Sequence, residues 1–408
     1  LGYAAYLDFF MFCKTIFPGI SDQAIAKMVA GVDVDLFRPD DELKRLARKA
    51  LDSGVAEAFS AGDVDATCEI LKSSADGQEW IASFEESAEP WFNFSTGSGF
   101  YHRDKIWIEN IEVPFEFIRN YIENLKEGKD LNRPVEAIRA ERDRVVNEYA
   151  ELISTDEDRE AFQGKLGLAR TVFPYVENHN FYVEHWAHSV IWRKMRELGA
   201  IMVDQGFWEK PDDIFYLKRV EVEEMLWDYF VSWATPEAPA GPGYWPPIIA
   251  DRRRKCSALA NWKPVPALGA PPEVITEPFT VMLWGITSDS VNSWLGGGEQ
   301  LEGELRGMAA SPGLVEGPAR VILSPEDIGQ MQEGEILVAP LTAPSWAPIF
   351  GRIQATVTDS GGMMSHAAIV CREYGLPAVT GTGFATAKIE TGQRIRVDGT
   401  NGVVTILD

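Results

Sequence analysis

Positive charge is scarce in this sequence of 408 residues: 38 Lys and Arg side chains stand against 62 Asp and Glu, and the net charge is −24. A chain this acidic repels nucleic-acid phosphates and anionic membrane surfaces, so we expect neither as a partner. The sequence also lacks any run of about 18 uncharged apolar residues, which excludes a membrane-spanning helix. Nucleic-acid-binding and membrane-embedded classes are therefore excluded.

Cysteine is also rare, and no two of the four are close in sequence: Cys13, Cys68, Cys256 and Cys371. This spacing excludes a disulfide framework and suits reduced thiols, so we expect a cytoplasmic location. The chain begins at Leu1 without a basic-then-apolar leader. We therefore expect no secretion signal, and some residues missing ahead of Leu1.

What the sequence has in quantity is aromatic side chains, with 13 Trp, 21 Phe and 11 Tyr. A large flat ligand or a bulky core would each explain this number, and composition leaves both open. Apolar residues make up 45% and charged residues 25%, as in globular proteins. The length predicts two or three domains.

Two regions of different character divide the chain. In residues 1–295 the apolar spacing is helical, for example along 134–153 and 177–203. From residue 305 to 408, short apolar runs separated by Gly and Pro predict strands at 319–323, 336–338, 355–357, 394–397 and 403–407, with one helix at 365–374. The predicted fold class is α+β. Residues 296–304, which begin with Gly296–Gly298, are the predicted hinge linker.

The most informative stretch is Thr358–Val379, TDSGGMMSHAAIVCREYGLPAV. Gly361 and Gly362 allow a tight turn, Ser365 caps a helix, and His366 lies in its first turn. Free amides and the positive end of the helix dipole favour an anion there and a neutral, nucleophilic imidazole. From the residues alone, a phosphohistidine carrier and a structural histidine both remain open.

This stretch resembles the phosphohistidine swivelling domain of the phosphoenolpyruvate-utilising family, which includes phosphoenolpyruvate synthase, pyruvate phosphate dikinase and rifampin phosphotransferase. The family pattern is matched at Thr358, Gly361, Gly362, Ser365, His366, Ala368, Ile369, Val370, Arg372, Glu373, Gly375, Pro377, Ala378 and Val379. The resemblance implies that His366 is the phosphoryl carrier, and that the phosphate is bound by Thr358, Gly361, Gly362, Ser365 and Arg372.

No ATP-grasp domain is visible in residues 1–304, and no pyruvate-binding barrel follows the swivelling region. The resemblance therefore implies a donor on another chain or domain. We expect ATP and Mg²⁺ to bind an ATP-grasp subunit that acts as the partner of this protein.

The helical region is similar to the substrate domain of rifampin phosphotransferase, and more so to the phosphohistidine subunit of phenylphosphate and alkylphenol phosphate synthases. The phrases that carry this likeness are 91–107, 177–186, 211–217 and 278–286. The implied reaction converts ATP, a phenol and water to an aryl phosphate, AMP and phosphate. The alternatives are a rifampin-type antibiotic phosphotransferase and a non-catalytic phosphorelay protein.

A predicted acceptor site lies on the helix that begins at Glu177, because three of the five histidines fall within the ten residues 179–188. Each could also be an ordinary core histidine. A phenol needs a base, and we name His179 and His185, oriented by Glu177 or Glu184, with His179 preferred. Glu177 matches a catalytic Glu of rifampin phosphotransferase, whose neighbouring Arg is replaced here by Val176. The expected substrate-binding residues are Phe181, Tyr182, Trp186, His188 and His102.

Two further patterns are weaker. His185, His188 and Glu184 have the spacing of metal ligands on a helix, but no other cluster accompanies them, so we predict no metal. The loop Ser95–Phe100, STGSGF, is rich in glycine and fits either a phosphate contact or a plain turn.

Overall fold

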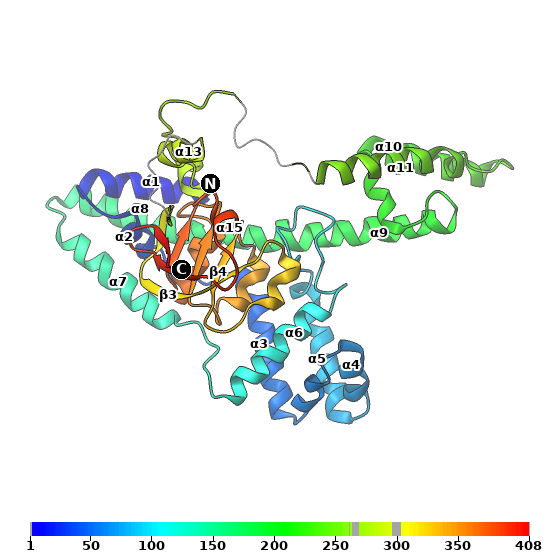
Figure 1. The fold of residues 1–408 in the computed structure, drawn as a ribbon, viewed down its shortest axis with the longest axis horizontal. Coiled ribbons are helices and arrows are strands. Elements are labelled where there is room, and N and C mark those ends of the chain that lie inside the picture. The colour runs from blue at the N-terminus through cyan, green and yellow to red at the C-terminus, as the bar shows by residue number, and fades with distance from the viewer. Residues whose placement is uncertain (1, 261, 263–268, 296–302, 408) are drawn as a thin grey trace.

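The computed structural model describes residues 2–260, 262, 269–295 and 303–407. The predicted hinge at Gly296–Gly298 lies outside the described residues. As predicted, a mostly helical region (residues 2–292) precedes a sheet domain (Figure 1). Among the described residues, no helix is long and apolar enough to cross a membrane.

The helical region forms two groups of helices and a long rod. One group contains α1 (Gly2–Ile16), α2 (Asp22–Met28), α7 (Val135–Glu151) and α8 (Asp156–His179). The second, below it in Figure 1, contains α3 (Arg38–Asp52), α4 (Val64–Lys72), α5 (Ala75–Trp91) and α6 (Glu112–Lys126), with the short helical turns η1 (Asp35–Phe37) and η2 (Ala56–Ala61).

The rod runs from α8 through the π-helical segment η3 (Asn180–Ala187) into α9 (His188–Asp204). It begins at Asp156 rather than at Glu177, where the acceptor helix was expected to start, and the Asp158 backbone N–H donates to the Thr155 hydroxyl at 3.0 Å, which caps the helix. Its far end carries an arm that points away from the rest of the molecule (Figure 1). The arm consists of η4 (Pro211–Tyr216), α10 (Arg219–Ala234) and α11 (Gly241–Ala260).

The sheet domain has eight strands in the order β1-β8-β7-β3-β4-β5-β6-β2. Strands β3 to β6 are parallel neighbours, and the remaining pairs are antiparallel. The strands are β1 (Glu304–Arg306), β2 (Met308–Ser311), β3 (Leu314–Val321), β4 (Ile336–Ala339), β5 (Ala355–Thr358), β6 (Ala378–Thr380), β7 (Arg394–Asp398) and β8 (Val403–Ile406). The helical elements are α14 (His366–Tyr374), α15 (Ala385–Lys388), η5 (Pro325–Gln330) and η6 (Pro344–Ile349).

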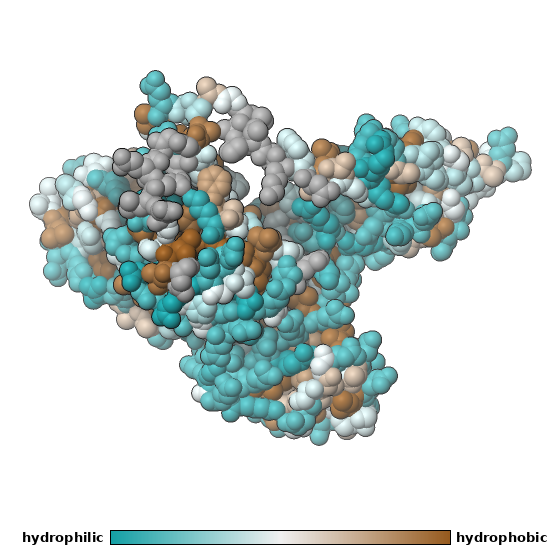
Figure 2. Space-filling view, viewed as in Figure 1, coloured by the Kyte–Doolittle hydropathy of each residue, from teal (hydrophilic) through white to brown (hydrophobic). Residues whose placement is uncertain are grey.

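The two regions are docked together along an interface that we call the seam. One apolar cluster joins Phe181 of the rod to Trp346, Phe350 and Val370 of the sheet domain. A second joins α1, α2, α7 and α8 to Met363, Met364 and Ile369, together with Met282 of α12 (Pro278–Trp284). The surface in Figure 2 is mainly hydrophilic over α3 to α6, as the charge implies, and hydrophobic residues gather over the sheet.

Two local expectations from the sequence are wrong. The apolar run at 214–217 predicts a short strand, but these residues lie mostly in the 3₁₀ turn η4, where the carboxylate of Asp213 accepts from the Lys210 backbone N–H and caps the turn. The Pro- and Gly-rich stretch 236–247 predicts a loop, but α11 begins at Gly241 within it. Pro242 costs little there, since the first amides of a helix have no partner within it, whereas Pro246 and Pro247 lie beyond the first turn and each remove one intrahelical donor.

Candidate phosphohistidine site

His366 is the first residue of α14, directly after its N-cap Ser365. Its Nδ1 atom is 2.8 Å from the Thr342 hydroxyl, so Nε2 is the ring nitrogen left for a phosphoryl group. Burial lowers the pKa of His366 to about 3, which keeps the imidazole neutral and nucleophilic at pH 7. The geometry therefore supports the predicted carrier role.

The contact of Thr342 with His366 was not predicted from the sequence, although the order of the strands could have indicated it. Parallel strands β4 and β5 are neighbours, and their carboxyl ends lie at the same edge of the sheet. The loop after β4 carries Thr342, and the loop after β5 carries His366, so a hydroxyl in the first loop falls beside the imidazole.

The Gly361–Gly362 turn is where we expected backbone amides to bind phosphate. In this docked arrangement those amides donate to α12: Gly361 N–H to the Trp284 carbonyl at 3.2 Å, and Gly362 N–H to Leu283 at 2.9 Å. Met364 N–H adds a third bond, to the Met282 carbonyl at 2.8 Å. A Cβ on Gly362 would lie 2.3 Å from that carbonyl oxygen, so the contact requires glycine. We call α12 with these three hydrogen bonds the α12 clamp.

The other expected phosphate ligands are also engaged elsewhere. The Thr358 hydroxyl donates to the Ser360 carbonyl, and the Ser365 hydroxyl donates to Gly362. Arg372 donates to the Ala310 carbonyl and faces the seam on another side of α14. In the docked arrangement, these expected ligands are thus not gathered around the His366 ring. The amides at the start of α14 are the donors nearest to it in sequence.

His185 is fully buried, and it is near enough to His366 for the two imidazoles to interact electrostatically. The Ser95 backbone N–H donates to its Nδ1 atom at 3.2 Å, and its Nε2 atom has no hydrogen-bond partner in the described part of the chain. Burial, and to a smaller extent the nearby His366 and His188, lower the pKa of His185 to about 3. Because Nδ1 accepts a hydrogen bond, neutral His185 carries its proton on Nε2.

The loop Ser95–Phe100 fills the space between the rod and the sheet domain. Its Thr96 carbonyl accepts from the Ser345 hydroxyl at 2.6 Å in a buried contact. Gly99 lies so close to the rod that a Cβ would meet the Glu184 carbonyl oxygen at 1.8 Å. This glycine-rich loop therefore holds His185 in place and contacts the carrier domain, which is more than a plain turn does.

His179, the base that the sequence favoured, has a different environment. Its ring is 57% exposed and lies 3.5 Å from the Glu184 carboxylate. Glu184 is one of the two carboxylates expected to orient the base, but it is His185 whose pKa is influenced by His366. Glu177 is 3% exposed, and its burial raises its pKa to about 7. Arg372 of the carrier domain opposes that rise, so a cation approaches Glu177 even though Val176 replaces the expected arginine.

The five expected substrate-binding residues divide into two sets. His188 and His102 belong to a group of stacked rings: His188 is parallel to Trp192 at 5.8 Å, and His102 is parallel to Phe215 at 4.1 Å. Phe100 packs on His188 at 5.5 Å and extends this ring group.

The second set does not join the ring group. Phe181 is fully buried in the core against Trp91 and Phe94. Tyr182 donates to Asp35 and Trp186 donates to Glu89. Within the described residues, no group of three or more His, Cys, Asp or Glu side chains could hold a metal ion.

Comparison with known proteins identifies the class of the carrier domain. Residues 331–402 match the family described as PEP-utilising enzyme, mobile domain. The chain contains a phosphohistidine mobile domain related to those of phosphoenolpyruvate synthase and rifampicin phosphotransferase, which confirms that resemblance.

Individual relatives extend the match beyond this domain. An uncharacterized phosphotransferase, YvkC of Bacillus subtilis, is 28% identical over 305 residues, or 74% of this chain and 34% of that protein. Rifampicin phosphotransferase of B. subtilis is 33% identical over 205 residues, or 50% of this chain and 20% of that protein. A probable phosphoenolpyruvate synthase of Staphylothermus marinus is 50% identical over 102 residues, or 24% and 12%. The chain thus spans about a third of the length of YvkC.

Proposed function

We propose that this protein carries a phosphoryl group on His366 from ATP to the hydroxyl of a phenol or alkylphenol. ATP and Mg²⁺ bind an ATP-grasp subunit or domain outside these 408 residues, and the mobile domain travels between that site and the rod. The phosphotransferase names of YvkC and of the rifampicin enzyme support the reaction class. The aromatic ring group on the rod supports a flat acceptor.

The observation that carries the proposal is the position of His185, which is fully buried and near enough to His366 for the two imidazoles to interact electrostatically. A carrier histidine has to deliver its phosphoryl group to a place that excludes water, because water competes as acceptor. The docked arrangement provides such a place, and its floor presents a buried, unpaired N–H on His185 Nε2.

The tautomer of His185 changes the role that we predicted for it. Its Nδ1 atom is occupied by the Ser95 N–H, and its Nε2 atom already carries a proton, so it cannot accept one from a phenol without becoming a buried cation. It can instead donate a hydrogen bond to a phosphoryl oxygen. Such a donor, fixed before the reaction and shielded from water, stabilises the charge of the transferring group.

The transfer step balances without a second base. The acceptor oxygen attacks phosphorus, the P–N bond of phosphorylated His366 breaks, and the electron pair returns to Nε2. The hydroxyl proton ends on that same Nε2, which restores the neutral imidazole. Phosphoryl transfer requires little covalent assistance and depends mainly on positioning and charge stabilisation.

The test is a chase of the isolated phosphoprotein. The protein is labelled from β-labelled ATP by an ATP-grasp partner, purified, and mixed with phenol, an alkylphenol, a rifamycin or buffer alone. We expect rapid transfer of label to the phenols and slow loss in buffer. Equal rates of loss in all four mixtures would refute an acceptor function.

A rifampin-type acceptor is the second candidate. The match to rifampicin phosphotransferase covers 205 residues, so it reaches well beyond the sheet domain into the helical region. If the label passes to the rifamycin and not to the phenols, this candidate replaces the first. The role of His366 is the same in both.

A further inference from the structure

A charged cavity of about 310 Å³ lies in the seam, on the side of α2 and α7. Its helical wall includes Lys27, Glu141 and Arg142, and its other wall includes Ser311, Pro312 and Arg372 of the carrier domain. At about 30 Å³ for each molecule, it has room for about ten waters. Because each region supplies one wall, the cavity exists only while the two regions are docked.

Arg372 is the most unusual part of the lining. Among the residues that the structure describes, its side-chain hydrogen bond goes to the Ala310 carbonyl at 2.9 Å. The side chain is half-buried, and a guanidinium has five N–H donors, so donors remain for water or for a ligand in the cavity. The cavity is where a ligand could satisfy the remaining donors.

The other charges of the lining leave a positive excess. Glu141 is its single carboxylate, and hydrogen bonds from Arg144 and Lys27 lower the pKa of Glu141 to about 2, so it stays ionised and paired. Arg142 pairs with the exposed Asp143 at 2.8 Å. The lining therefore holds three cations and one carboxylate, but Lys27 and Arg142 already pair with Glu141 and Asp143, which leaves the Arg372 guanidinium as the donor available to a ligand.

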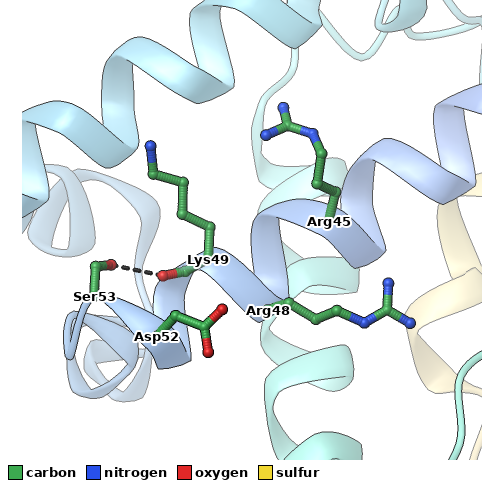
Figure 3. A pocket seen from close by; sticks show the side chains of 5 residues that line it. All are labelled: Arg45, Arg48, Lys49, Asp52 and Ser53. Carbon is green, nitrogen blue, oxygen red and sulfur yellow. Dashed lines mark hydrogen bonds between the residues drawn. The ribbon is translucent and has the colours of Figure 1, made fainter.

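A basic hollow on α3 provides a contrast. Figure 3 shows Arg45, Arg48 and Lys49 around a surface hollow of about 440 Å³. Arg45 already pairs with Glu42 at 2.8 Å, and Lys49 pairs with Glu79 at 2.9 Å. The α3 hollow belongs to one region alone, so occupancy there has no direct connection with docking.

We infer that the seam cavity is a binding site for a small phosphate-type dianion, either inorganic phosphate or a phosphate monoester. The guanidinium groups of Arg142 and Arg372 suit the tetrahedral oxygens of such a ligand. Since the ligand contacts both walls, its binding stabilises the docked arrangement by mass action and slows departure of the carrier domain. The inference goes beyond the proposed function and does not depend on the identity of the acceptor.

The test measures binding of inorganic phosphate and of phenyl phosphate to the full chain by calorimetry, at constant ionic strength with chloride as reference. We expect saturable binding of both probes. The probe that binds more tightly shows whether the natural ligand is inorganic phosphate or a phosphate monoester. Removing one charged hydrogen-bond donor, in Arg142→Gln or separately in Lys27→Gln, should weaken binding by about tenfold. The matched control Lys49→Gln removes the same charge at the α3 hollow and should leave the affinity unchanged.

Amide hydrogen exchange provides the second measurement. Phosphate should slow exchange at the start of α7 and in the β2–β3 turn of the wild type and of Lys49→Gln, and should have little effect on Arg142→Gln. The inference is overturned if neither probe binds in excess of chloride. It is also overturned if Lys49→Gln loses as much affinity as the two cavity variants.

Discussion

His185 and His366 are both kept neutral by desolvation, although His185 is fully buried and His366 is half-buried, and their hydrogen bonds differ. His366 has a rotatable hydroxyl, that of Thr342, on Nδ1, and a hydroxyl can donate or accept. His185 has a backbone N–H, that of Ser95, on Nδ1, and a backbone N–H can only donate. The first arrangement suits a nitrogen that gains and loses a phosphoryl group. The second fixes one tautomer and suits a permanent donor.

The largest effect is expected from removing the carrier. His366→Ala should abolish incorporation of β-label from ATP and all product formation, because no other ring in the described seam has a free nitrogen lone pair facing the donor path. Label is followed by autoradiography after digestion, with thermal melting as the control for folding. Label on a peptide that lacks His366 would refute the carrier assignment.

The second-largest effect is expected at His185, and it tests whether this side chain acts as a hydrogen-bond donor or as a base. His185→Phe removes the Nε2 donor and should slow transfer from the phosphoprotein to the acceptor by about 100-fold, as loss of one preorganised donor does. His185→Gln retains an N–H donor and should stay within about tenfold of the wild type.

Formation of phosphohistidine should be unchanged in both His185 variants, since that step uses another site. Nitrogen NMR of the wild type gives an independent measurement, with the proton expected on Nε2. If His185→Gln is as slow as His185→Phe and the proton is on Nδ1, then His185 acts as a base.

A smaller effect is expected at the carrier itself. Thr342→Val keeps the shape but removes the hydroxyl from His366 Nδ1, and one hydrogen bond is worth up to about tenfold in rate. Both half-reactions should slow, because the ring is oriented in each. A change in the transfer step alone would mean that Thr342 contacts the acceptor rather than orienting the imidazole.

The last prediction concerns stability rather than rate, through the pH dependence at Glu177. Its pKa rises from 4.5 to about 7 on folding, so between these values the folded protein keeps a proton that the unfolded chain has lost. Stability therefore falls as pH rises through this window, by about 3 kcal/mol in total. Glu177→Gln should be more stable than the wild type at pH 8 and equal to it at pH 4.5.

Chemical denaturation at the two pH values checks the Glu177 prediction. The control is Glu197→Gln, at an exposed position paired only with Lys194. The raised pKa would be contradicted if the free energy of unfolding of the wild type, relative to that of Glu177→Gln, did not fall between pH 4.5 and pH 8.

The carrier half of the site could be predicted from sequence because it is local. Ser365, His366 and the Gly361–Gly362 turn lie within six residues, and helix-capping rules place them together. The strands β3, β4, β5, β7 and β8 were predicted, while β1, β2 and β6 were missed. The missed strands have three or four residues and carry little alternation, and β4, β5 and β8, also of four residues, were recognised because their residues are mostly apolar or β-branched.

The acceptor half could not be predicted, because it is assembled from distant segments. Ser95 and His185 are 90 positions apart, and the partner of a ring nitrogen follows from tertiary contact alone. The preference for His179 relied on its neighbour Glu177, whereas burial selected His185. The occupation of the Gly361 and Gly362 amides by the α12 clamp likewise depends on how the two regions dock.

The π-helical segment Asn180–Ala187 has a consequence for the phase of the rod. A π-helix has more residues per turn than an α-helix, so it shifts the angular position of every side chain that follows it. The direction of His185 and of the ring group beyond it is therefore set by residue count within this segment, as well as by residue identity. Deleting one residue there while the segment returns to α-helical winding would largely preserve the direction of His188 and Trp192 relative to Glu177, and would change instead which side chains within the segment face the seam.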